Sequence, residues 1–136
     1  MVVDYAHHPT EIAAALLQAR LVAGEGRVVA VFQPHLYSRT VNFADRFAEE
    51  LLAADQIVLA DIFAAREDPV PGVSTGLVLT ELRNRGRTAE YVPGESPEQS
   101  AVRGADATGR GDLLILLGAG DINQGAEAAL ARWENP

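Results

Sequence analysis

Two short, uninterrupted apolar runs constrain the fold of this chain more than any other feature. Residues 28–32 are VVAVF and residues 113–117 are LLILL, with no polar side chain in either run. Such runs are typical of parallel strands that are covered on both faces, because a strand with one wet face alternates polar and apolar residues. The two runs therefore predict a sheet with a layer of helices on each side.

Strand-like and helical segments alternate along the rest of the sequence. Short apolar segments at 2–4, 56–60 and 90–92 predict further strands. Helical patterns lie between them: from Pro9 to about Ala23 with a stop at Gly24, around Phe43, Phe47 and Leu51, after Ser74, after the Ser96–Gln99 capping box, and after Gly120. This alternation is typical of strands joined by helical crossovers. We predict a Rossmann-like α/β fold, a mostly parallel sheet of about six strands with helices on both faces.

Composition limits the classes of function. A length of 136 residues without a long linker fits a single domain over residues 1–136. No apolar run approaches the roughly 20 residues of a membrane-spanning helix, so we expect no membrane partner and a cytoplasmic location. The absence of cysteine excludes disulfides, thiolate zinc sites and cysteine nucleophiles. The net charge of −8 argues against nucleic acid as a partner.

Ligands of a parallel sheet bind outside the carboxyl ends of its strands, and three segments that follow predicted strands are chemically unusual. The first, residues 4–9, is DYAHHP. The Asp4 carboxylate can accept hydrogen bonds from ribose hydroxyls, and the helix N-terminus after His8 favours anions. The alternative is structural: Tyr5 packs in the core, and His7 and His8 satisfy backbone groups of the loop.

The second segment, residues 33–40, is QPHLYSRT and precedes the next predicted helix. It combines an amide, an imidazole, a phenol, a hydroxyl and a guanidinium. Arg39 can hold a carboxylate through two parallel hydrogen bonds, which fix orientation as well as charge. The structural alternative is a surface loop in which Thr40 or Asn42 caps the following helix.

The third segment, residues 118–121, is GAGD and resembles half of a dinucleotide fingerprint. The third glycine of that fingerprint is replaced by Asn123, so we predict no nicotinamide cofactor. We expect Asp121 to be the helix N-cap, while Gly118 and Gly120 allow a tight turn or the close approach of a substrate.

Three further acids need placing. Asp61 and Glu67 flank the end of the 56–60 strand and are weaker candidates for the same crevice. We expect Glu11 on a solvated helix face.

Taken in order, VDYAHHPTEI at 3–12, FQPHLYSRT at 32–40 and GAGDI at 118–122 resemble the C-terminal domain of the Mur ligase family. The resemblance covers almost the whole chain. The DYAH element indicates the wider family, whereas the FQPHxYSRT element points to the member that adds L-alanine. The member that recycles murein tripeptide shares DxAHHP but lacks the second element, and it remains the alternative within the family.

The resemblance implies one domain of a three-domain cytoplasmic ligase whose substrates are UDP-N-acetylmuramate, L-alanine and ATP, with Mg²⁺ on the phosphates. ATP activates the muramyl carboxylate as an acyl phosphate, which the alanine amine then attacks. The resemblance assigns Asp4 and Tyr5 to ATP, His7 and His35 to the alanine and phosphate end, and Arg39 to the alanine carboxylate. Residues 118–121 are a candidate substrate loop, with Gly118, Gly120 and Asp121 as its members. The resemblance implies no metal ligand in this chain.

Two departures limit what the resemblance implies. Family members often carry arginine at the position of Leu36, so any contact of that arginine is in doubt here. All 11 basic residues are arginine, whereas the family's phosphate-loop lysine and a modified lysine near magnesium lie in the central domain. We therefore expect this chain to act with N-terminal and central domains and to have no ligase activity alone.

Two other classes remain open. A free-standing nucleotide-binding Rossmann-like module fits the strand–helix alternation, which many folds share. A metal site using His7, His8 and His35 is disfavoured, because adjacent histidines on a turn rarely direct both rings to one ion.

Overall fold

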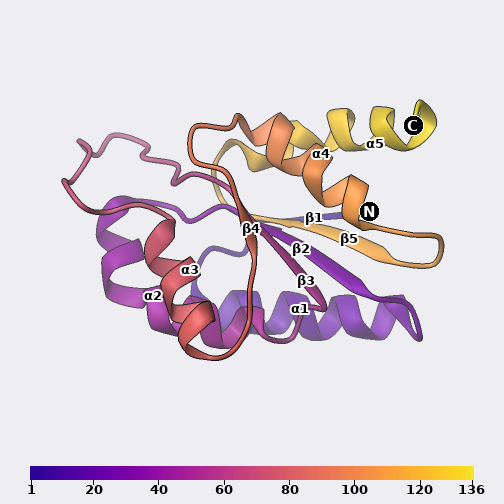
Figure 1. The fold of residues 1–136 in the computed structure, drawn as a ribbon, viewed down its shortest axis with the longest axis horizontal. Helices are drawn as coiled ribbons and strands as arrows, with labels where there is room; N and C mark the ends of the chain where they lie inside the picture. The colour runs from indigo at the N-terminus through magenta and orange to yellow at the C-terminus, as the bar shows by residue number, and fades with distance from the viewer.

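The computed structural model describes all residues from 1 to 136 and contains one five-stranded sheet (Figure 1). Its strands are β1 (Val2–Asp4), β2 (Val28–Phe32), β3 (Gln56–Leu59), β4 (Glu90–Tyr91) and β5 (Leu113–Leu117). The spatial order is β1-β5-β2-β3-β4 and every neighbouring pair is parallel. The predicted α/β fold is confirmed with five strands, and the two apolar runs form the adjacent strands β2 and β5.

Helices cover both faces of the sheet, as predicted. One layer contains α1 (Pro9–Ala23), α2 (Tyr37–Leu51) and α3 (Gly76–Asn84), and the other contains α4 (Pro97–Ala107) and α5 (Ala126–Glu134) (Figure 1). A 3₁₀ helix, η1 (Asp121–Gly125), leads into α5. None of these helices combines the length and the apolar character that crossing a membrane requires.

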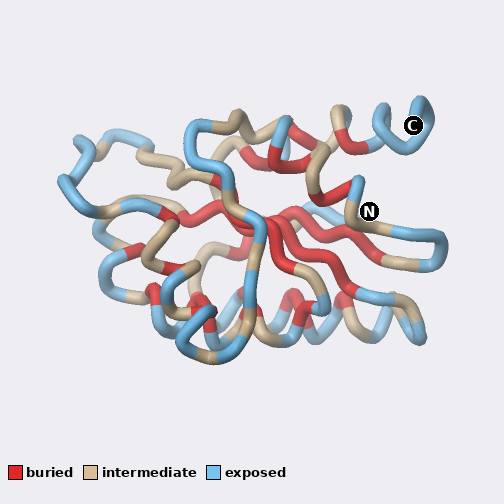
Figure 2. The backbone as a smooth tube through the Cα atoms, in the orientation of Figure 1, coloured by how far each residue is buried: buried red, intermediate tan, exposed pale blue.

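The central strands supply a core on each face by alternating the direction of their side chains. In β2, Ala30 and Phe32 belong to the core beneath α1, α2 and α3, whereas Val29 and Val31 belong to the core beneath α4 and α5. All residues of β2 and β5 are buried, and Figure 2 shows the buried backbone concentrated in the sheet. Helix α4 packs so closely that a Cβ added at Gly104 would lie 2.4 Å from Val31 Cγ2.

Several helix ends follow local sequence signals. Helix α1 ends at Ala23, and Gly24 follows with φ +58°, a conformation that glycine adopts at little cost. The capping box of α4 is formed as predicted: Ser96 Oγ accepts from Gln99 N at 3.1 Å, and Gln99 Oε1 accepts from Ser96 N at 2.8 Å. Local sequence therefore determines these boundaries.

Helix α1 begins at Pro9, as predicted, whereas the start of α2 differs from the prediction. Glu11 is exposed, but it also closes a capping box, because its Oε1 accepts from His8 N at 3.0 Å. Helix α2 begins at Tyr37, within the segment predicted to precede it, and the alternative in which Thr40 or Asn42 caps the helix is wrong. The Thr40 hydroxyl lies inside the helix and donates to Leu36 O at 2.8 Å.

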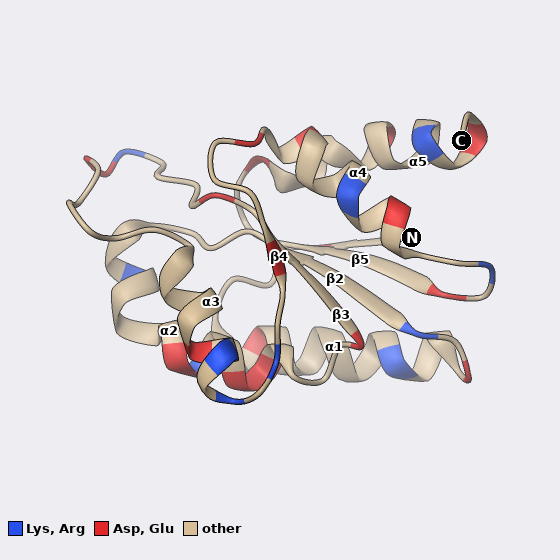
Figure 3. Cartoon of the chain, viewed as in Figure 1, with Lys and Arg blue, Asp and Glu red and all other residues tan.

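We call the two ends of the parallel strands the N-terminal edge and the C-terminal edge of the sheet. At the N-terminal edge, Arg27 pairs with Asp112 at 2.9 Å and Arg20 pairs with Asp55 at 2.6 Å. Figure 3 shows basic and acidic residues together where β2 and β5 begin. The C-terminal edge carries the three candidate segments.

Candidate functional site

The strand order brings the three candidate segments together. Strands β1, β5 and β2 are neighbours and run in the same direction, so the segments that follow them leave the sheet at one edge. The loop after β5 is bonded to both sides: Gly118 N donates to Asp4 O at 3.1 Å, and Gln33 N donates to Leu117 O at 2.9 Å. Residues more than 110 positions apart in the sequence therefore border one site.

The first segment divides into exposed and structural residues. Tyr5 is 65% exposed, so the alternative that it packs in the core is wrong. Asp4 Oδ1 accepts from Ala6 N at 2.9 Å, which fixes the carboxylate at the end of β1. His8 is the N-cap of α1, and its Nδ1 accepts from Thr10 N at 3.3 Å. Of the two histidines, His8 therefore has the structural role that was the alternative.

His7 and His35 bring the first two segments into contact across β5. Their ring centroids lie 5.7 Å apart, and the His35 ring lies 5.6 Å from that of Phe63. His7 Nδ1 lies 3.0 Å from Tyr5 O, whereas His35 Nδ1 is buried without a hydrogen-bond partner. Burial lowers the pKa of His35, and the positive charges of Arg39 and His7 lower it further, against a smaller opposing effect of Glu67. The His35 ring is therefore held in its neutral form.

Arg39 lies in the first turn of α2, so a helix and not a flexible loop positions it. Its Nη1 atom is buried and has no hydrogen-bond partner. Five of the other ten arginines contrast with it, because they form ion pairs: Arg20, Arg27, Arg85, Arg103 and Arg132. A buried guanidinium nitrogen without a partner loses hydration without compensation. Such a group is suited to bind an anion that reaches it.

The third segment is held by protein contacts. Gln33 is only 3% exposed, and its Nε2 donates to Asp121 Oδ1 at 2.6 Å while its Oε1 accepts from Ile122 N at 3.1 Å. The prediction that Asp121 is an N-cap is wrong, because Gly120 occupies that position and the Asp121 carboxylate is bonded to Gln33. A Cβ at Gly120 would lie 2.3 Å from Phe63 Cγ. The close approach at this glycine is therefore to a protein side chain.

Glu67 contributes more to the site than its sequence position indicates. Its Oε1 accepts from Tyr37 N at 2.5 Å and from Ser38 N at 3.2 Å, and its Oε2 accepts from the Ser38 hydroxyl at 2.5 Å. No local sequence pattern predicts these contacts, because the partners are 29 and 30 positions apart in the sequence. Asp61 has a different role, because it accepts from the Tyr91 hydroxyl at 2.7 Å. Burial of the Tyr91 hydroxyl, together with this hydrogen bond, raises the pKa of Tyr91 to about 12.

Leu36, at the position where the family often has arginine, is the N-cap of α2 and has φ +71°. This left-handed backbone is unfavourable for a residue with a branched side chain. Leu36 N donates to Phe63 O at 2.9 Å, which holds the strained residue against the segment after β3. The guanidinium that the resemblance implies at this position is absent, because residue 36 is leucine.

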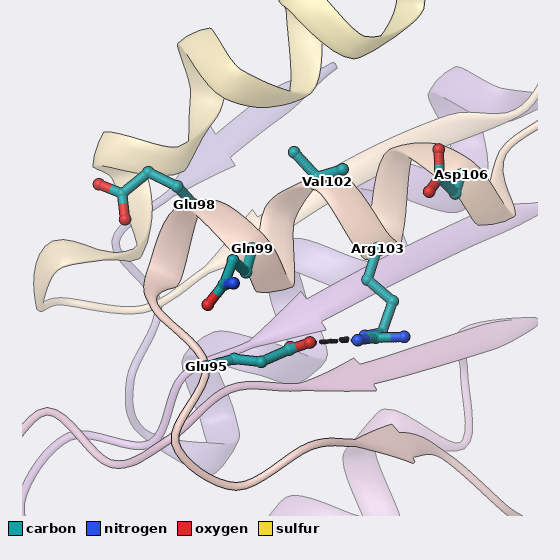
Figure 4. Close-up of a pocket in the computed structure, with 6 residues that line it drawn as sticks. All are labelled: Glu95, Glu98, Gln99, Val102, Arg103 and Asp106. Carbon is teal, nitrogen blue, oxygen red and sulfur yellow. Dashed lines mark hydrogen bonds and ion pairs between the residues drawn. The ribbon is translucent and has the colours of Figure 1, made fainter. Parts of the chain in front are cut away.

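Two hollows lie near the loops. A cavity of about 140 Å³ at the C-terminal edge has nine lining residues, among them Gln33, Phe63 and Asp121. A hollow of about 360 Å³ lies on the outer face of α4, where Figure 4 shows Glu95 and Arg103 directed toward each other. The α4 hollow contains no residue of the three candidate segments. No group of three or more histidine, aspartate or glutamate residues converges to hold a metal ion.

Comparison with known proteins identifies the family. The sequence profile of the family described as "Mur ligase, glutamate ligase domain" matches residues 1–120. The UDP-N-acetylmuramate–L-alanine ligase of Cutibacterium acnes is 49% identical over 120 residues, which cover 88% of this chain and 25% of that protein. The protein of the same name from Clavibacter michiganensis subsp. michiganensis is 46% identical over 136 residues, which cover 98% of this chain and 28% of that protein.

A solved structure agrees in fold. The crystal structure of UDP-N-acetylmuramate-alanine ligase from Thermotoga maritima superposes with a TM-score of 0.71 at 24% identity, covering 97% of this chain and 26% of that one. The chain thus spans about a quarter of the length of the curated relatives it matches. The resemblance seen in the three motifs is confirmed, and the chain belongs to the Mur ligase family as a C-terminal domain.

Proposed function

We propose that this chain is the amino-acid-binding domain of an ATP-dependent ligase that joins L-alanine to UDP-N-acetylmuramate in peptidoglycan synthesis. One observation carries the proposal. Arg39 Nη1 and His35 Nδ1 are both buried and both without partners, four residues apart at the C-terminal edge of the sheet. The names of the relatives support the choice of L-alanine, and the FQPHLYSRT element contains both residues.

The chemistry asked of this chain is binding and orientation. Arg39 holds the alanine carboxylate through parallel, charge-assisted hydrogen bonds. His35 and His7 line the same end, and a neutral His35 adds no charge that competes with the guanidinium. With the carboxylate held, the alanine amine is directed toward the activated muramyl carboxylate, which turns the attack into an effectively intramolecular step.

In this proposal ATP transfers its γ-phosphoryl group to that carboxylate and leaves as ADP, and the attack of the amine on the acyl phosphate then releases inorganic phosphate. In our proposal Asp4 and the exposed ring of Tyr5 contact the ribose and base of ATP. The approach of the phosphates raises the pKa of His35, against the lowering by burial. The histidine and acidic residues here form no metal cluster, so we assign the binding of Mg²⁺ to the N-terminal and central domains of the whole enzyme. The Gly118–Asp121 loop borders the substrate and is kept in place by Gln33.

The test is Arg39→Ala in the full-length enzyme that contains this chain. We expect the KM for alanine to rise about a hundredfold, because a charge-assisted pair to a buried carboxylate contributes roughly 2–5 kcal/mol and about 1.4 kcal/mol is tenfold. The KM values for ATP and UDP-N-acetylmuramate should change by less than about twofold. Arg83→Ala is the matched control, since Arg83 is exposed in α3. An unaltered KM for alanine refutes the assigned role of Arg39.

The chain by itself gives a second measurement. We expect the purified 136-residue chain to show no ATP-dependent formation of ADP in the presence of the other substrates. Turnover by this chain alone would contradict the assignment of the catalytic steps to other domains.

A further inference from the structure

The N-terminus of α2 is capped from a distant segment. Its N-cap residue, Leu36, makes no side-chain hydrogen bond to the helix. The first-turn donors are satisfied by Glu67, which accepts from Tyr37 N, Ser38 N and the Ser38 hydroxyl. A carboxylate at a helix N-terminus is favoured by the helix dipole as well as by these bonds. The loop after β3 therefore determines where the first turn of α2 lies.

These contacts affect Arg39 directly. Arg39 directly follows Ser38, the residue that Glu67 holds, and the Nη1 atom of Arg39 has no hydrogen-bond partner. The Glu67 carboxylate bonds to the start of α2 and forms no hydrogen bond to Arg39 Nη1. The Ser38 hydroxyl and the two backbone amides hold the pKa of Glu67 below its usual range. Glu67 therefore remains a carboxylate at neutral pH.

The segment after β3 also holds the backbone around His35. Phe63 N donates to Pro34 O at 2.9 Å, and Leu36 N donates to Phe63 O at 2.9 Å. These two bonds flank His35, whose ring lies against Phe63. The strained backbone of Leu36 persists because its neighbours are bonded on both sides. Residues 63–67 thus fix the backbone on both sides of His35 and in the first turn of α2, which carries Arg39.

We propose that Glu67 is a positioning residue of the ligase, which fixes the first turn of α2 so that Arg39 and His35 face one substrate carboxylate. The inference rests on the proposed function and adds a specific residue to it. Glu67 acts through Arg39 and does not touch the substrate. It follows that the loss of Glu67 affects alanine binding selectively and does nothing further once Arg39 is gone.

The experiment compares four variants of the full-length enzyme: Glu67→Gln, Glu67→Asp, Arg39→Ala and the Glu67→Gln, Arg39→Ala double variant. We expect Glu67→Gln to raise the KM for alanine about tenfold, a loss comparable to that of a strong helix cap. Glu67→Asp keeps a carboxylate and should recover part of that loss. In the double variant the KM should equal that of Arg39→Ala alone, because coupled residues are not additive. Glu25→Gln, at an exposed acid after α1, is the control with the same change of charge.

A measurement on the 136-residue chain tests the contact itself. Glu67→Gln should shift the NMR amide signals of Tyr37 and Ser38, and Glu25→Gln should leave them in place. If both variants leave these signals unchanged, the cap is not present in solution and the inference is overturned.

The kinetic outcomes separate the inference from the proposed function. If Arg39→Ala raises the KM for alanine and Glu67→Gln does not, positioning by Glu67 is overturned and the proposed function stands. Equal increases in the KM values of all three substrates, or additive effects in the double variant, also overturn it. If neither variant changes the KM for alanine, the role of Arg39 in the proposed function fails, and that of Glu67 fails with it.

Discussion

The two edges of the sheet use the same residue type in opposite ways. At the N-terminal edge, Arg27 bonds to Asp112 and to Ala107 O, and Arg20 bonds to Asp55. At the C-terminal edge, Arg39 has a buried nitrogen with no partner. Arg20 and Arg27 are partly exposed, whereas Arg39 Nη1 is buried, so the arginine without a partner at this atom is the one that water compensates least.

The difference separates groups that stabilise the fold from groups that are available to a ligand. Asp112 accepts from Gly109 N and Arg27 N as well as from the guanidinium, and these bonds close the loop before β5. Buried polar groups in proteins are almost always hydrogen-bonded, so the exceptions call for an explanation. Violations of this rule concentrate at functional sites, and the unpartnered atoms here lie at one edge only.

Glycine substitutions at the two edges give the largest contrast. Gly120→Ala places a Cβ 2.3 Å from Phe63 Cγ, and we expect it to lower the free energy of unfolding by about 2–3 kcal/mol. Gly109→Ala is the matched change at the other edge, where the nearest atom lies at an ordinary 3.5 Å. Urea denaturation of the 136-residue chain measures both. Equal effects would show that the C-terminal edge adapts as easily as the N-terminal edge.

Charge removal gives the second contrast. Asp55→Ala leaves Val28 N and Arg20 without their acceptor, so we expect a loss of about 1–2 kcal/mol in the free energy of unfolding. Arg39→Met removes a group that has no bond to lose at Nη1 and should change stability by less than about 0.5 kcal/mol, or raise it. The same urea experiment decides the point. A comparable loss in both variants would mean that Arg39 has a structural role.

Acid titration gives the smallest contrast. The pKa of His35 is lowered in the fold, so its protonation is easier in the unfolded chain, and stability falls as pH drops from about 7 toward 5. The pKa of Asp112 is lowered to about 2, so its contribution is complete above about pH 4 and is lost as pH falls through 2. His35→Asn should flatten the first range and Asp112→Asn the second, measured as melting temperature against pH. An NMR pKa of His35 at or above 6.5 contradicts this account.

Much of the fold is predictable from sequence because its signals are local. The runs that became β2 and β5, the capping box at Ser96, and the glycine after α1 each act within a few residues. The start of α2 is not predictable from nearby residues, for the opposite reason. Its cap comes from Glu67, 29 and 30 residues away, so a search for a nearby Thr40 or Asn42 could not find it.

The location of the candidate site, at the carboxyl ends of the strands, was predictable from the sequence, but its contacts were not. The rule that ligands bind at the carboxyl ends of strands located all three segments, and their proximity follows from the strand order. The division of roles did not follow from residue type. His7 and His8 are adjacent and chemically identical, yet His8 caps α1 while His7 lies near His35. Aspartate is a common N-cap residue, but the Asp121 carboxylate is bonded to Gln33.

The position of β5 between β1 and β2 has a consequence for synthesis of the protein. The last strand of the chain is inserted at the centre, where Val2 pairs with Ile115 and Ala30 with the same residue. A ribosome must therefore release residues 113–117 before β1 can join the sheet at all. Contacts this distant in sequence form slowly, and until they form β1 lacks the strand with which it pairs. The C-terminal edge with its three candidate segments is therefore complete only when nearly the whole domain has been made.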